Sequence, residues 1–269
     1  ALDAAELMNT GVQYLREHIP TDNRVHYAIT NSGGNAPGTV QPYAEVLYLM
    51  RAPGLAGVKE LYSRVNKIAE GAALMTETTV KGEFIKACSN MVLNRELLAV
   101  AQKNLEEIGP QTFDEQDQQL AAAFQKTQNS SYSYYDELMN DVKDAARRKA
   151  LEQDKQSPLH AVIMPFPAEK QGFASSDVGD VSWVCPVAQF NITTMPSGTV
   201  MHSWQEVALG KSAMAKKGML YAGRVIAASV IDVISDPAVI VRAKAEMAER
   251  TGNAAFVSPI PADLKPHIR

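Results

Sequence analysis

Two histidines stand where an imidazole could take part in catalysis. His26 lies in residues 24–30, where alternating apolar residues predict a strand that carries His26 on the opposite, more polar face. His202 lies in a predicted loop between a core strand and a long apolar helix. Ligands often bind in such loops, and imidazole is both a metal ligand and a proton carrier near neutral pH. A half-exposed sheet residue and a structural loop residue are the alternative interpretations of the two histidines.

Two further polar segments carry side chains that could bind a substrate. Asp177 and Asp180 lie on either side of a Val-Gly pair, just before a predicted core strand. Asn90 and Asn94 flank the point where the chain leaves another predicted strand. Acidic residues with glycine are common in turns, and asparagine is a frequent helix N-cap, so turn formation and capping also explain these residues. Taken alone, the residues leave the function open.

The composition is typical of a soluble globular protein with one large domain or two ordinary ones. The chain has 269 residues, of which 46% are hydrophobic and 21% charged. The formal charge is 26 − 30 = −4, without a long basic run, which argues against a nucleic-acid or anionic-membrane partner. The two cysteines, Cys88 and Cys185, lie far apart, which favours a reducing, cytoplasmic location. The longest uncharged stretch, 181–205, is interrupted by prolines and is expected to form buried strands, with no membrane helix.

The first third of the chain alternates between helical and strand patterns. Helices are predicted up to Ile19 and over 55–75, and strands over 24–30, 43–51 and 80–88. This order is that of a split β-α-β-β-α-β sandwich that lacks its first strand. The sequence also opens without methionine, inside a helical stripe, so we expect a fragment of a longer protein.

The remainder is predicted to mix helices with core strands. The predicted helices begin at Asn94, at a capping box in Thr112–Glu115, near 136, near 211 and after Pro237. The predicted strands are 160–166 and 181–190, and residues 192–195 extend the second strand or form a short third strand. The helix over 211–235 is apolar nearly all round in its second half, so we expect it to be buried against a sheet.

Several segments, in the same order, resemble the zinc-dependent amidohydrolase and peptidase family that includes aminoacylases, carboxypeptidase G and the plant auxin-conjugate hydrolases. The segments are residues 1–9, 24–30, 41–48, 87–90 with Asn94, 176–183, 202–205, 210–213 and 217–219. Together these segments are specific, whereas each alone would not be. The resemblance extends from residue 1 to about residue 250.

The resemblance implies the fold class α/β with an α+β lid. Residues 1–92 would form the lid and dimerisation domain, a split β-α-β-β-α-β unit without its first strand. Residues 93–269 would form the C-terminal portion of the α/β metallopeptidase catalytic domain. The implied activity is cleavage of the amide bond of an N-acyl or aryl-acyl amino acid, such as aminobenzoyl-glutamate. The implied assembly is a homodimer through the lid, with two divalent metal ions, expected to be zinc, in each site.

The resemblance also implies roles for four residues. His202 matches a zinc-ligand histidine, and His26 matches a lid histidine that stabilises the oxyanion in the partner subunit's site. Asn90 is similar to a lid asparagine near the substrate, and Asp177 lies in a turn that borders the site. Two zinc ions would hold the attacking hydroxide, and a glutamate would transfer the proton.

The sequence departs from the family pattern in its metal ligands. No His-x-Asp motif occurs in the chain, and Glu106-Glu107 lies in the wrong place to replace the paired glutamates. One histidine cannot hold two metal ions. We therefore expect this chain alone to bind zinc weakly and to be inactive, and we expect a second subunit or a further N-terminal segment to supply the other ligands. A non-catalytic dimerisation or regulatory protein and a dipeptidase with the same site are the alternative functions.

Overall fold

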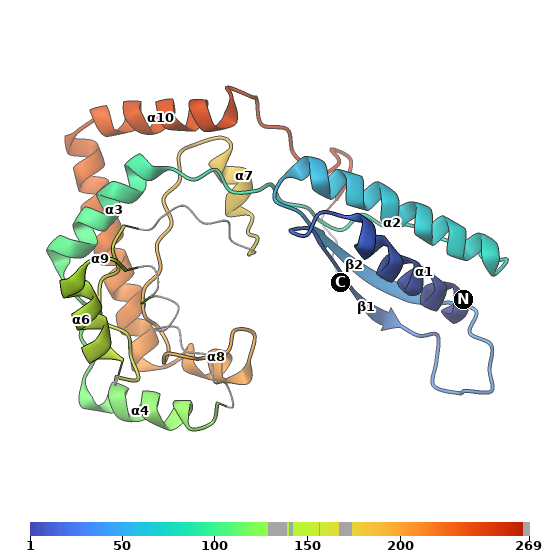
Figure 1. Cartoon of the computed structure of the whole chain (residues 1–269), viewed down its shortest axis with the longest axis horizontal. Helices are drawn as coiled ribbons and strands as arrows, with labels where there is room; N and C mark the ends of the chain where they lie inside the picture. The colour runs from blue at the N-terminus through green and yellow to red at the C-terminus, as the bar shows by residue number, and fades with distance from the viewer. Residues whose placement is uncertain (129–138, 140–141, 156, 167–173, 266–269) are drawn as a thin grey trace. The chain divides into compact units, whose positions relative to one another are not determined.

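The computed structural model describes residues 1–128, 139, 142–155, 157–166 and 174–265 (Figure 1). The chain divides into two compact units. Unit 1 is residues Ala1–Met91, Gln171–Val184 and Ala255–Arg269, and unit 2 is residues Val92–Lys170 and Cys185–Ala254. The described residues form helices in both units and a two-stranded sheet in unit 1, so the expectation of a mixed helix and sheet protein is confirmed in this coarse form.

Unit 1 packs two helices against one face of a two-stranded sheet. Its elements are α1 (Leu2–Leu15), the 3-10 turn η1 (Arg16–His18), β1 (Arg24–Asn31), β2 (Glu45–Arg51), α2 (Leu55–Met75) and the short helix α7 (Val178–Ser182). The strands are antiparallel, with His26 opposite Leu49. Figure 1 shows α1 and α2 side by side along the sheet. A core of Val12 from α1, Val25 from β1 and Leu61 from α2 joins the three layers.

The predicted third strand of unit 1, residues 80–88, is wrong. The segment has no regular secondary structure, and the sheet of the described residues contains only β1 and β2. An alternating pattern favours an extended chain, but a strand also needs a neighbouring strand to complete its hydrogen-bond ladder. Residues 80–88 instead pack on α2, where the rings of Phe84 and Tyr62 meet edge to face with centroids 5.8 Å apart. The split sandwich therefore stays a prediction.

Unit 2 is mainly helical. Its described helices are α3 (Arg95–Ile108), α4 (Glu115–Gln125), α6 (Ala145–Asp154), α8 (Trp204–Leu209), α9 (Ala213–Ser235) and α10 (Ala238–Thr251). Asn94 caps α3 as predicted, because its side chain accepts a hydrogen bond from the backbone N–H of Leu97. The capping box of α4 begins later than predicted, with Asp114 and Asp117 in place of Thr112 and Glu115. The polar helix predicted from about 136 to 153 begins later than predicted in the described residues, because residues 142–144 are not helical and Asp144 caps α6. Most of residues 136–141 lie outside the described residues.

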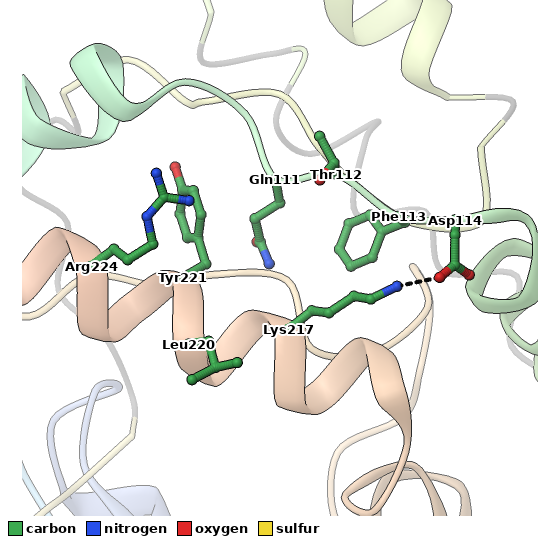
Figure 2. A pocket seen from close by; sticks show the side chains of 8 residues that line it. All are labelled: Gln111, Thr112, Phe113, Asp114, Lys217, Leu220, Tyr221 and Arg224. Carbon is green, nitrogen blue, oxygen red and sulfur yellow. Dashed lines mark hydrogen bonds and ion pairs between the residues drawn. The ribbon is translucent and has the colours of Figure 1, made fainter.

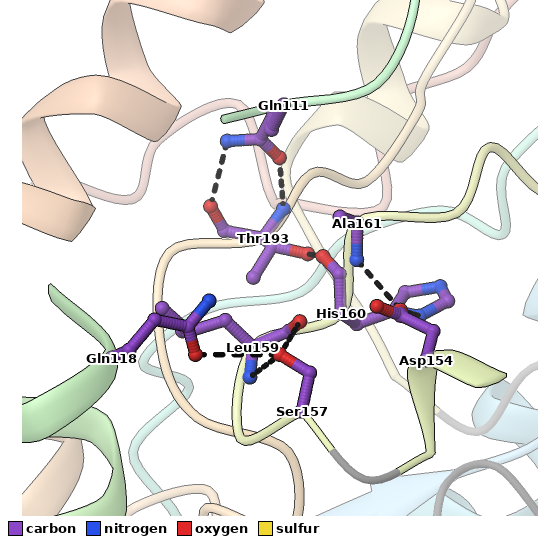
Figure 3. A network of polar contacts seen from close by, with 8 residues as sticks. All are labelled: Gln111, Gln118, Asp154, Ser157, Leu159, His160, Ala161 and Thr193. Atoms are coloured by element: carbon purple, nitrogen blue, oxygen red, sulfur yellow. Dashed lines mark hydrogen bonds and ion pairs between the residues drawn. The ribbon is translucent and has the colours of Figure 1, made fainter. Parts of the chain in front are cut away.

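The predicted strands 160–166, 181–190 and 192–195 are also wrong. Residues 178–182 form helix α7, and the described parts of the other segments run without a ladder. Side chains supply the hydrogen bonds that a neighbouring strand would supply (Figure 3). The Gln111 amide accepts from the Thr193 backbone N–H (2.9 Å) and donates to the Thr193 carbonyl (3.1 Å), and Thr193 Oγ1 donates to the His160 carbonyl. Side chains therefore take the place of a neighbouring strand around His160 and Thr193.

Helix α9 differs from its prediction in burial. The helix was expected to be buried nearly all round, yet Ile226, Ile231 and Ile234 are each more than half exposed. Its buried residues, Met214 and Val225 among them, lie along one side. Among the described residues, α9 is the one helix long and apolar enough to cross a membrane by length and composition.

Candidate functional site

His26 lies on the open face of the sheet in unit 1. The neighbouring residue Val25 points into the core beneath α1 and α2, so alternation along β1 directs His26 to the other face, where it is exposed. Its cross-strand partner is Leu49 of β2, which is also exposed. The backbone ladder between β1 and β2, which extends before and after His26, makes the strand a rigid support for an imidazole that faces away from the core.

The sheet also carries two arginines beside His26. Arg24 and Arg51 are paired across the ladder, two residues from His26 and Leu49 respectively, on the same face by alternation. Arg51 Nη2 donates to Ser175 Oγ (3.3 Å), which lies just before Asp177. The open face of the sheet is therefore linked to the segment that holds a second candidate residue.

Asn90 and Asp177, predicted from separate parts of the sequence, lie in two segments that contact each other. Asp180 Oδ1 accepts a hydrogen bond from the backbone N–H of Ser89 (2.8 Å), and Trp183 Nε1 donates to the Asn90 carbonyl (2.9 Å). A β-carbon on Gly179 would lie 2.1 Å from the Ser89 carbonyl oxygen, so only glycine allows this approach. The structure thus brings these two candidates together within unit 1.

The two acids of the Asp177–Asp180 turn have different roles. Asp180 is half-buried and holds Ser89, whereas Asp177 is exposed and, among the described contacts of its side chain, bonds only to the Ser176 hydroxyl (3.2 Å). The Ser176 hydroxyl also accepts from the backbone N–H of Val178, as in an ordinary turn. Asp177 is therefore the acid of the pair that a ligand could reach, and Asp180 is structural.

His202 lies in unit 2, at the entry to α8. The residue is exposed, and its φ of 61° lies in the left-handed region, which is uncommon for a residue with a side chain. Glu206 Oε2 accepts a hydrogen bond from the His202 backbone N–H, and Ser203 caps α8. The His202 imidazole is therefore exposed and lies outside the aliphatic core.

The described residues do not form a metal site by themselves. No group of three or more His, Cys, Asp or Glu side chains that could hold a metal ion occurs within them. Catalytic zinc sites in proteins use three protein ligands. The residues in the described part of the chain therefore do not fit a two-zinc centre, and no step that involves a metal ion can be derived from their geometry.

Unit 2 contains a cavity of about 420 Å³ that the sequence did not indicate (Figure 2). The cavity is lined by Gln111, Thr112, Phe113, Asp114, Lys217, Leu220, Tyr221 and Arg224. Lys217 Nζ donates to Asp114 Oδ2 (2.6 Å) and to buried Asp117, so this charge is already neutralised. The hydrogen bond from Lys217 lowers the pKa of Asp114, and the hydrogen bonds to Asp114 and Asp117 raise the pKa of Lys217. The ion pair ties α4 to α9, and none of the four predicted site residues lines the cavity.

The chain is similar to known hydrolases. It is 40% identical over 269 residues to one subunit of the p-aminobenzoyl-glutamate hydrolase of Escherichia coli (strain K12), across 99% of this chain and 56% of that protein. The resemblance predicted from the sequence is confirmed. The chain is also 32% identical over 116 residues to the Xaa-Arg dipeptidase of Mus musculus, across 43% of this chain and 27% of the dipeptidase. No family model matches the chain. The chain thus spans little more than half the length of the hydrolase polypeptide that it matches.

Proposed function

We propose that this chain is part of a metal-dependent amidohydrolase that cleaves the amide bond of an N-acyl or aryl-acyl amino acid such as aminobenzoyl-glutamate. The observation that carries the proposal is the 40% identity to the E. coli hydrolase polypeptide, sustained across 99% of this chain. The contact between the Asn90 and Asp177 segments supports the proposal, because it gathers two of the expected substrate-side residues in one unit.

Each candidate residue has a defined task in this proposal. His26 donates an N–H to the oxyanion that develops on the scissile carbonyl, and its exposed place on a strand suits that task. Such a donor is worth about 2.7–4 kcal/mol, or a factor of about 10² to 10³ in rate. Asn90 and Asp177 contact the substrate, and His202 is a metal ligand. Two divalent metal ions, held mostly by residues outside the described part of this chain, would supply the activated hydroxide and polarise the carbonyl.

The assembly is part of the proposal. A second subunit or a further segment of polypeptide supplies the other metal ligands, because the described residues hold no cluster of three. The E. coli relative is named as one subunit of its hydrolase, which is consistent with a complex of several polypeptides. A homodimer through residues 1–92 would bring His26 to the site of the partner subunit. The location is cytoplasmic and the substrate a small molecule.

The test is a chimera in which these 269 residues replace the matched region of the E. coli hydrolase polypeptide. We expect the chimera to release p-aminobenzoate from p-aminobenzoyl-glutamate and to lose this activity with a chelator, whereas the isolated chain is inactive. His26→Ala should lower kcat about 10² to 10³-fold. His18→Ala is the matched control, since His18 is also exposed in unit 1 but lies in η1. A folded, metal-loaded chimera without hydrolysis would refute the proposal.

A dipeptidase is the second candidate. The match to the Xaa-Arg dipeptidase over 116 residues favours it. The two candidates differ in the leaving amino acid, so a panel of aryl-acyl glutamates and of dipeptides with C-terminal arginine, measured with the same chimera, distinguishes them by kcat/KM. A non-catalytic dimerisation protein would cleave neither class.

A further inference from the structure

The cavity of unit 2 lies between one side of α9 and the loop that joins α3 to α4 (Figure 2). Its helical wall consists of Lys217, Leu220, Tyr221 and Arg224, and a spacing of three and four residues places these side chains on one side of a helix. The other wall is the loop of residues 111–114. The volume of about 420 Å³ lies within the range of pockets that bind small molecules.

Most polar side chains that line the cavity already have hydrogen-bond partners within unit 2. These side chains are Gln111, Asp114, Lys217 and Tyr221. Lys217 is paired with two carboxylates, those of Asp114 and buried Asp117, so its charge is compensated. Tyr221 is buried and donates its hydroxyl proton to the Gly109 carbonyl (2.7 Å), so its ring is a fixed wall. These groups shape the cavity, while their own charges and hydrogen bonds are already used.

Arg224 is different, because its positive charge is open to a ligand. The residue is exposed and makes no hydrogen bond or ion pair in the contacts described for its side chain. It lies seven residues after Lys217, or about 10 Å along the helix axis. Burial raises the pKa of Tyr221, and the nearby charge of Arg224 opposes that rise. The guanidinium therefore lies beside the phenol at one end of the cavity (Figure 2).

We propose that this cavity binds a small organic monocarboxylate with an aromatic or aliphatic body, and that Arg224 pairs with the carboxylate. A guanidinium donates two parallel hydrogen bonds to a carboxylate, which fixes the direction of the bound group. The body of the ligand lies along Phe113, Leu220 and the Tyr221 ring, and Phe113 is itself packed against the core of unit 2. None of the four candidate site residues lines the cavity, so this inference goes beyond the proposed function and does not depend on it.

The charge at the other end of the cavity selects against a dianion. Two carboxylates, Asp114 and Asp117, share the cation of Lys217, so this end keeps a net negative charge. A phosphate ester or a dicarboxylate would bring a second negative charge toward it, and like charges repel. A monocarboxylate at Arg224 places only its uncharged body near Phe113. Acetate would form the ion pair but would gain little from the apolar walls.

Benzoate is the probe that tests this site. The arginine Nε–Hε resonances of the ¹⁵N-labelled chain report directly on each guanidinium, and the resonance that is missing in Arg224→Gln is that of Arg224. We expect benzoate to shift this resonance. Benzamide has nearly the same shape without the charge and should bind at least about tenfold more weakly. Acetate and the dianion phenyl phosphate should also bind more weakly than benzoate.

Substitutions on the helical wall separate the charge from the apolar contact. Arg224→Gln should weaken benzoate binding at least about tenfold, because an amide lacks the charged fork. Arg148→Gln is the matched control, since Arg148 is also exposed on a helix of unit 2 but does not line the cavity. Leu220→Ala should weaken the binding of benzoate but not of acetate. Arg224 and Leu220 are both exposed, so these variants should stay folded, which circular dichroism checks.

Four results would overturn the proposal. Equal binding of benzoate and benzamide would mean that no ion pair forms. Equal binding of benzoate by the wild-type chain and by Arg224→Gln would place the carboxylate elsewhere. Tighter binding of phenyl phosphate than of benzoate would assign the cavity to a phosphate ester. An Arg224 resonance that benzoate shifts neither in the isolated chain nor in the chimera would mean that the cavity does not bind this class of ligand. None of these readouts involves hydrolysis, so they are independent of the proposed reaction.

Discussion

Unit 1 and unit 2 hold their extended segments in different ways. In unit 1, β1 and β2 pair through a backbone ladder, and Val25 of β1 is buried against Val12 of α1 and Leu61 of α2. In unit 2, the segments around His160 and Thr193 are extended but are held by the Gln111 amide and by hydroxyl groups (Figure 3). An apolar or alternating pattern therefore predicts an extended segment. Whether that segment pairs with another strand or with side chains depends on which other segments lie beside it.

The largest expected loss of stability comes from adding a methyl group where α9 contacts the Thr193 segment. A β-carbon on Gly218 would lie 2.6 Å from the Thr193 carbonyl oxygen and 2.8 Å from Thr194 Cγ2. Gly218→Ala should therefore destabilise unit 2 by about 2–4 kcal/mol through overpacking of a core contact. Chemical denaturation followed by circular dichroism measures this change.

The control for that substitution lies in the same helix. Gly223 has no atom within 4 Å of an added β-carbon. Gly223→Ala should raise the stability by up to about 1 kcal/mol, because alanine is the better helix former. Equal effects of the two substitutions would contradict the packing of α9 against the Thr193 segment.

Removal of the hydrogen bonds between Gln111 and Thr193 should destabilise unit 2 nearly as much. Gln111→Leu removes both hydrogen bonds to the Thr193 backbone and leaves its N–H and carbonyl without these partners. We expect a loss of about 2 kcal/mol, since each unsatisfied buried polar group costs about 1–3 kcal/mol. Gln119→Leu is the control, because Gln119 bonds only to exposed Glu115 in the contacts described for its side chain. A Gln111→Leu protein as stable as the control would mean that the network does not replace a ladder.

A smaller loss of stability is expected from a substitution in unit 1. Tyr48 on β2 donates a hydrogen bond to the buried Asn9 side chain of α1, and Tyr48→Phe should cost about 1 kcal/mol. Burial, and to a lesser extent Tyr27, raises the pKa of Tyr48 to about 12. A raised tyrosine pKa means that the folded state favours the neutral phenol, so this stability is complete below pH 10 and is lost as the pH rises from 10 through 12. In denaturation between about pH 9 and 12, the Tyr48→Phe protein should lack this component of the decline.

The smallest effect is expected from the ion pair in the cavity of unit 2. The hydrogen bond from Lys217 lowers the pKa of Asp114, so its contribution is present above the unfolded pKa and is lost as the pH falls through the folded value. Asp114 is largely exposed, so the contribution is small. Asp114→Asn keeps an N-cap residue at the start of α4 and leaves Lys217 paired with buried Asp117, and it should make the acid side of the stability profile shallower. An unchanged profile below about pH 4 would show that solvent screens the pair completely.

Local features were predictable from the sequence where they depend on neighbouring residues. The limits of β1 and α2 and the Asn94 cap follow from periodicity and capping. Features that depend on distant partners were not predictable. Residues 80–88 and 181–190 carry strand patterns, but the described residues offer no neighbouring strand, and Gly179 has a role that is visible only when Ser89 lies against it.

The same distinction between local and long-range features applies to the candidate site. The sequence predicts Asn90 and Asp177 separately, and their proximity comes from contacts between distant segments, such as the hydrogen bond between Ser89 and Asp180. Arg51 was not singled out, although its place at the end of a strand beside His26 was a usable signal. The sequence predicts that nearly all sides of α9 are buried, whereas one side is exposed. The periodicity of the sequence does not indicate what would cover that side.

In the proposed function, this chain supplies one ligand, His202, to a two-metal amidohydrolase site that a further polypeptide completes. The most direct test of this claim is the zinc content of the purified chimera, measured by atomic emission together with hydrolysis of p-aminobenzoyl-glutamate. We predict that each polypeptide of the chimera binds two zinc ions. The His202→Ala chimera should lose zinc and hydrolysis, and the His18→Ala chimera should lose neither. Full zinc content and activity in His202→Ala would contradict the claim.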